Sequence, residues 1–237
     1  QGLRPLPVVV GDTAPSFELP DTSGQVHAVP ADPAPPATVI VQTCNHCPYV
    51  IAWNPRLRAV AEEYAPRGVR FLGIHANDAT RYPADSLEHM KRFVREHDWP
   101  YPNLHDESQD VAHALGAEVT PHVFVLDGQQ RLVYRGAPDA DHRDSSQDAA
   151  WLRRALDAVL AGHAVAEPDT PALYDVCLRT ADAARMAVSR ALRRLSSETR
   201  GRYLPADRAD EIEPPALRGP ATVSQGGERD AELRVPS

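Results

Sequence analysis

The chain has 237 residues, 42% of them hydrophobic and 24% charged, and a formal net charge of −8. This length fits one domain with an extension, and the apolar content is sufficient for a core. The acidic balance argues against a nucleic-acid-binding protein, no apolar run approaches the roughly 18 residues of a membrane span, and three cysteines are too few for a disulfide-stapled scaffold. No secretory signal is visible, so cytoplasmic is the default location. The chain begins with Gln1 rather than with Met.

The first predicted elements are a hairpin, a buried strand and a helix. Apolar runs at 17–19 and 26–29 flank the turn sequence Asp21-Thr22-Ser23-Gly24, which predicts a β-hairpin. Residues 38–43 are β-branched and apolar on both faces, as in a central strand. Apolar residues at helical spacing then predict a helix over about 47–65.

Strands and helices alternate in the next hundred residues. Asp85, with Glu88 three residues later, resembles a capping box at a helix start. Strand–helix–strand units predict parallel strand pairs, and a late hairpin adds an antiparallel edge. The fold class is therefore α/β, with a central mixed sheet flanked by helices. The elements predicted after the first helix are a strand at 69–74, helices at 86–97 and 107–115, strands at 122–126 and 132–134, and a helix at 148–160.

The C-terminal part differs in character from the rest of the chain. We predict one domain over 8–165, a helical extension over 166–195 and a disordered tail over 196–237, because the tail is rich in proline and glycine and lacks periodicity. The arginine-rich stretch 178–195 could bind an acidic partner or a membrane surface. Such stretches more often pack one face and solvate the other.

Two cysteines separated by two residues carry the clearest chemical signal. Cys44 and Cys47 lie between a buried strand and a helix, and the positive end of a helix stabilises a thiolate. Cysteines at this spacing can form a disulfide, so one can attack a target disulfide and the other can resolve the mixed disulfide. We predict that Cys44 attacks from the exposed end of the helix and that Cys47 resolves, with His46, Asn45 and Pro48 tuning the pair.

A Cys-x-x-Cys pair can serve two other purposes. Half of a zinc site would require a second cysteine or histidine pair placed to help, and the chain offers none at that spacing. Two inert buried cysteines are the other alternative. The position between strand and helix favours redox use, and neither a metal nor an organic cofactor is implied.

The element order, the Cys-x-x-Cys pair and a Thr-Pro dipeptide before the late strands resemble the thioredoxin fold. The resemblance implies that Thr120-Pro121 is cis and belongs to the substrate groove. A proline that merely starts an edge strand is the alternative. Tyr49, directly after the motif, could also shape the groove, whereas Trp53 is expected in the core.

A narrower set of motifs is similar to the peroxiredoxin-like (AhpC/TSA, redoxin-domain) family, in its subgroup with a thioredoxin-type Cys-x-x-Cys. The resemblance covers about residues 8–177. The motifs that carry it lie at 11–17, 43–50, 75–78 and 132–136. Cys177 could be a second resolving cysteine, but its spacing from Thr170-Pro171 and the missing glycine favour a free, partly buried thiol.

The resemblance leaves two chemistries to compare. Peroxiredoxins resemble Pro-x-x-x-Thr-x-x-Cys at the peroxidatic site, and Cys47-Pro48 matches its end. Cys44 and Ile40 stand where threonine and proline belong, and Pro121 lies where the family's arginine would fall. We therefore predict a thiol–disulfide oxidoreductase. A thiol peroxidase with Cys47 peroxidatic, or a non-catalytic redoxin-fold binding module, is the alternative.

The predicted partners follow from this chemistry. The substrate would be a disulfide-containing protein or a small-molecule disulfide, and electrons would come from another dithiol. The sequence predicts neither the direction of electron flow nor the oligomeric state. Asn77 and Asp78 are expected in a polar loop, and His75, His105, His113 and His122 at ordinary polar positions.

Overall fold

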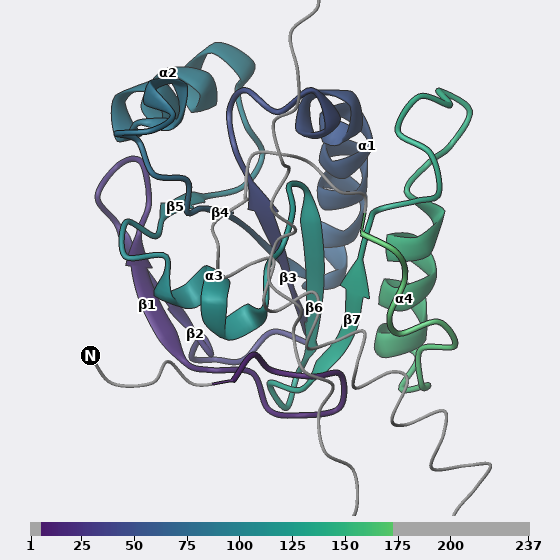
Figure 1. Ribbon diagram of the computed structural model, residues 1–237. Helices are drawn as coiled ribbons and strands as arrows, with labels where there is room; N and C mark the ends of the chain where they lie inside the picture. The colour runs from purple at the N-terminus through teal and green to yellow at the C-terminus, as the bar shows by residue number, and fades with distance from the viewer. Residues whose placement is uncertain (1–5, 173–237) are drawn as a thin grey trace, which may run out of the picture. The chain divides into compact units, whose positions relative to one another are not determined.

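A five-stranded sheet with the order β5-β4-β3-β6-β7 forms the centre of the computed structural model, which describes residues 6–172 (Figure 1). β3, β4 and β5 are parallel, whereas β6 is antiparallel to both β3 and β7. The mixed sheet is confirmed. The sequence analysis missed β5, because three residues are too few to show a period. The strands are β3 (Ala37–Thr43), β4 (Arg70–His75), β5 (Asn103–His105), β6 (His122–Asp127) and β7 (Leu132–Gly136).

The strand register brings three chain segments to one edge of the sheet. Thr43 pairs with His75 across β3 and β4, and Gln42 pairs with His122 across β3 and β6. The carboxyl ends of β3 and β4 therefore lie beside the amino end of β6. The segment that begins at Cys44, the segment after β4 and the segment before β6 all leave the sheet at this edge.

Helices cover both faces of the sheet, as predicted. α1 (Pro48–Tyr64) and α4 (Ala150–Leu160) pack together on one face, where Trp53 and Leu152 belong to the same core cluster. α3 (Asp110–Leu115) and the hairpin of β1 (Phe17–Pro20) and β2 (Val26–Val29) supply the core on the other face (Figure 1). The continuous burial along β3 agrees with this arrangement, because a strand covered on both faces buries both sets of side chains.

The start of α2 (Leu87–His97) corrects one prediction. Its N-cap is Ser86, and no side chain caps it. Asp85 instead ends the 3-10 turn η2 (Pro83–Asp85) and is 2% exposed. The capping-box interpretation is wrong, because the Asp85 carboxylate has partners inside the protein.

Several predictions fall on residues 1–5 and 173–237, which lie outside the described residues. Cys177 and the arginine-rich stretch are among them. The boundaries proposed for the domain, the extension and the tail stay predictions. Within 6–172, no helix combines the length and the apolar character that crossing a membrane requires.

Candidate active site

Cys44, Cys47 and the Thr-Pro dipeptide meet at the edge of the sheet described above. The Cys44 Sγ lies 3.5 Å from the Thr120 hydroxyl, and the Cys47 thiol donates to the Thr120 carbonyl at 3.4 Å. The Thr120–Pro121 peptide bond is cis, as the resemblance implied. The structure therefore brings together two predicted pairs of site residues, Cys44/Cys47 and Thr120/Pro121, which lie more than seventy positions apart in the sequence.

Neither sulfur is at the surface. Cys44 is 2% exposed and Cys47 is fully buried, and both are in the thiol form. Cys47 is the N-cap of α1, so the turn from Cys44 to Cys47 precedes the helix, and Pro48 occupies its first turn as predicted. Val50 and Tyr49 pack against the two cysteines. The expectation that Cys44 lies at an exposed helix end is therefore wrong.

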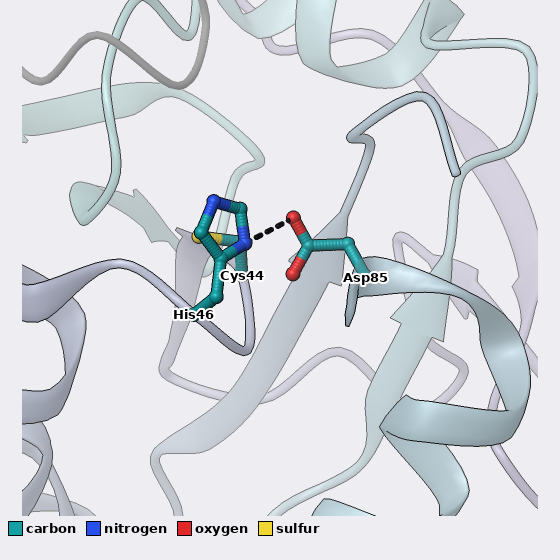
Figure 2. Close-up of side chains that lie close together, drawn as sticks. All are labelled: Cys44, His46 and Asp85. Atoms are coloured by element: carbon teal, nitrogen blue, oxygen red, sulfur yellow. Dashed lines mark ion pairs between the residues drawn. The ribbon is translucent and has the colours of Figure 1, made fainter. Parts of the chain in front are cut away.

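A buried carboxylate, Asp85, holds the turn between the cysteines. Its Oδ1 accepts a hydrogen bond from the Asn45 backbone N–H at 2.8 Å, and its Oδ2 accepts one from the Asn77 Nδ2 at 2.6 Å. The His46 Nδ1 lies 2.8 Å from the same Oδ2, and the Asp85 side chain is 0% exposed. Figure 2 shows the His46 imidazole facing this carboxylate. The Asn45 Nδ2 also donates to the Ala84 carbonyl at 3.1 Å, so segment 77–86 is fastened to the cysteine turn.

The surroundings of Cys44 disfavour its thiolate. The contact with the Cys47 thiol and the burial of the sulfur raise the pKa of the Cys44 thiol above its ordinary value. The negative charge of Asp85 raises this pKa further, whereas the Thr120 hydroxyl lowers it. The sequence indicates the opposite, a lowered pKa of the thiol, because the helix N-terminus and His46 would favour the thiolate.

Cys44, His46 and Asp85 place three potential metal-ligand atoms within 4.8 Å of one another. The 2.8 Å separation of the His46 Nδ1 and the Asp85 Oδ2 is the length of a charge-assisted hydrogen bond. Two nitrogen or oxygen ligands of a tetrahedral zinc ion, each about 2.0–2.1 Å from the metal, would lie about 3.3 Å apart. The observed separation is therefore that of a direct contact between imidazole and carboxylate, and is shorter than that of two ligands on one zinc ion.

The sequence model of the AhpC/TSA family matches residues 10–135, more than half of the chain. The chain belongs to the AhpC/TSA family. Members of this family are generally thiol-based oxidoreductases. No curated protein matches the sequence.

Solved structures similar to this AhpC/TSA chain include two of unknown function. A hypothetical protein from Sinorhizobium meliloti 1021 is 34% identical with a TM-score of 0.66, over 70% of this chain and 92% of the other. An uncharacterized conserved protein from Geobacillus kaustophilus is 38% identical with a TM-score of 0.66, over 69% and 88%. A putative thioredoxin from Neisseria meningitidis, 21% identical with a TM-score of 0.51 over 62% and 89%, shares the fold.

Two segments flank the cysteines of this AhpC/TSA protein. Tyr82, from segment 77–86, stacks on the His46 ring with 5.6 Å between ring centroids. On the other side, the half-buried Tyr49 meets the edge of His142 at 4.5 Å. Tyr49 therefore lies beside the pair, and its role in a substrate groove stays a prediction.

The segment that carries His142 is fastened to α1. Arg56 forms an ion pair with the buried Asp139 at 2.9 Å and donates to the Asp144 carbonyl at 2.6 Å. Trp53, predicted to lie in the core, is fully buried and donates to Asp139 at 2.7 Å. The sequence analysis assigned no role to this segment, because its contacts with α1 span more than eighty residues.

A buried histidine lies beneath the site. His75, at the carboxyl end of β4, is 3% exposed, and neither ring nitrogen has a hydrogen-bond partner among the described residues. Burial lowers the pKa of His75 to about 4, although the charge of Asp85 acts in the opposite direction. Sequence reasoning gave His75 an ordinary polar position. Of the polar pair after β4, Asn77 reaches the site through Asp85, whereas Asp78 is exposed and bonds Thr80.

Proposed function

We propose that this AhpC/TSA protein is a thiol–disulfide oxidoreductase in which Cys44 attacks a substrate disulfide and Cys47 resolves the product. The observation that carries the proposal is the contact of both sulfurs with Thr120, next to the cis Pro121, at a strand-to-helix junction. Two sulfurs that lie on one short turn and contact the same residue can form a disulfide with each other without a large movement of the backbone.

The reaction proceeds in two exchange steps. The Cys44 thiolate attacks one sulfur of a disulfide R–S–S–R′, forms Cys44–S–S–R and expels R′–S⁻, which takes up a proton. The Cys47 thiolate then attacks the Cys44 Sγ, expels R–S⁻ and leaves the Cys44–Cys47 disulfide. Two electrons and two protons pass to the substrate, and a dithiol donor returns them to the protein.

The other predicted site residues assist these steps in our proposal. Thr120 and Pro121 position the substrate backbone, and Tyr49 shapes the groove beside the sulfurs. His46, Asn45 and Pro48 tune the pair. Support for the tuning role comes from the Asp85 carboxylate, which contacts both the Asn45 backbone and the His46 ring.

Reduction of insulin and of a small aromatic disulfide, each driven by dithiothreitol, tests this function. The wild-type protein should accelerate at least one of the two reactions. Cys44→Ser should return the rate to that of buffer, because the attacking sulfur is lost, whereas Cys177→Ser serves as the matched control and should retain the rate. A Cys44→Ser variant that keeps full turnover would rule out the proposed role. A wild-type protein inactive in both reactions and toward peroxide would point to a binding module.

The burial of both sulfurs favours a second candidate, a thiol peroxidase, because a hydroperoxide is small enough to reach a sulfur that a folded protein cannot approach. The Cys47 thiolate would attack the O–O bond, become a sulfenic acid and release water or an alcohol. Cys44 would then condense with this sulfenic acid, releasing water and forming the disulfide. Hydrogen peroxide consumption that persists in Cys44→Ser and disappears in Cys47→Ser is the result expected for this candidate. Loss of peroxide consumption in Cys44→Ser, together with its retention in Cys47→Ser, would contradict this candidate.

A further inference from the structure

Asp85 places a buried negative charge beside the sulfur that the proposed function makes the attacking one. We propose that the Asp85 carboxylate destabilises the thiolate of reduced Cys44, so that the Cys44–Cys47 pair remains a reductant of disulfides rather than an oxidant. This inference rests on the proposed function, because it concerns the direction in which that pair passes electrons.

The geometry makes the carboxylate a fixed feature of the site. A carboxylate oxygen of Asp85 lies within 4.8 Å of the Cys44 Sγ, and the side chain is 0% exposed. Its two oxygens accept hydrogen bonds from the Asn45 backbone N–H and the Asn77 amide, which belong to the segments after β3 and β4. Water therefore screens the charge poorly, and charges interact more strongly in such an environment than at the surface.

The charge acts on one redox state more than on the other. The disulfide is neutral, whereas the reduced pair becomes negative when Cys44 loses its proton. A neighbouring carboxylate destabilises that thiolate and raises the pKa of the Cys44 thiol. Oxidising dithiol proteins owe their potential to a stabilised reduced form, as in DsbA. Asp85 acts in the opposite direction.

Several other groups face Cys44 or Asp85 and modify this effect. His46 opposes Asp85 when its ring is protonated, and Tyr82 stacks on that ring. The Cys47 thiol and the Thr120 hydroxyl contact the Cys44 sulfur. His75 responds to the charge of Asp85 and also to that of His105. A test must therefore separate Asp85 from His46, because their charges are opposite.

Asp85→Asn removes the charge and keeps an oxygen that can accept the Asn45 N–H. Compared with wild type, Asp85→Asn should react with iodoacetamide at Cys44 along a pH profile that lies at least about one unit lower. The same displacement is expected when both proteins also carry His46→Gln. Reduction potentials, measured against dithiothreitol buffers, should coincide near pH 6, where both dithiols are protonated. At pH 9 and above, the Asp85→Asn potential should exceed that of wild type, approaching a tenfold difference in the exchange equilibrium, or about 29.6 mV, once the pH is higher than the Cys44 pKa of both proteins.

Two variants complete the experiment. Asp78→Asn, in the same segment but exposed and bonded to Thr80, is the matched control and should behave as wild type. Asp85→Ser also removes the carboxylate charge, with a shorter side chain, and is the second variant. Its alkylation profile should likewise move to lower pH than that of wild type, which keeps the inference testable even if Asp85→Asn does not fold.

Unchanged alkylation profiles and unchanged pH 9 potentials in Asp85→Asn would overturn the inference while leaving the proposed function intact. Failure of the wild-type protein to lose two hydrogens on oxidation, observed by mass spectrometry, would overturn the proposed function itself. The two failures are therefore distinguishable.

Discussion

Replacing Cys47 by serine is expected to abolish catalysed turnover and to leave Cys44 joined to its substrate in a stable mixed disulfide. In the proposed reaction, Cys47 is the sulfur that releases the substrate from Cys44, and serine does not attack a disulfide. The burial of Cys47 favours this outcome, because outside thiols reach the mixed disulfide slowly when the surrounding side chains exclude them.

The measurement is the intact mass of the Cys47→Ser variant after exposure to a small disulfide, in a Cys177→Ser background so that Cys44 is the one cysteine left in the chain. We expect one adduct, located on Cys44 by peptide mapping and removed by dithiothreitol. The control adds Cys44→Ser to the same protein and should carry no adduct. An adduct on Cys47 in the Cys44→Ser variant, with none on Cys44 in Cys47→Ser, would reverse the assigned roles.

Acid should destabilise the protein through His75, by up to about 3 kcal/mol between pH 6.5 and pH 4. Burial holds the pKa of His75 at about 4 in the folded protein, against about 6.5 for an exposed histidine. Between these values the unfolded chain binds a proton that the folded protein does not, so the free energy of unfolding rises with pH. The contribution of neutral His75 to the free energy of unfolding is fully present above about pH 6.5 and is lost as the pH falls toward 4.

Urea unfolding at pH 7 and at pH 4.5 measures this effect. His75→Gln keeps a neutral polar side chain at the position and should reduce the difference between the two pH values by roughly 2–3 kcal/mol. Should the variant not fold, the His75 ring protons of the wild-type protein can be followed by NMR, where no titration is expected above about pH 5. Titration of His75 near pH 6.5 would contradict the prediction.

Local patterns in the sequence determined much of the fold. Residues 38–43 are apolar on both faces, and this pattern alone specifies a strand buried between two layers, which the structure shows as β3. The Cys-x-x-Cys spacing placed both sulfurs on one turn before a helix. Thr120-Pro121 was found from the family resemblance, since nothing in its local composition distinguishes it from an edge-strand proline.

Tertiary structure decided the environment of the cysteines. Asp85 lies forty residues from Asn45, and its local sequence fits a helix cap. It reaches the site because β3 and β4 are parallel neighbours, so the segments after them leave the sheet at the same edge. The burial of Cys44 and Cys47 likewise depends on packing around the turn. Sequence periodicity reports which residues share a face of one element, whereas the charge beside a sulfur depends on which elements become neighbours.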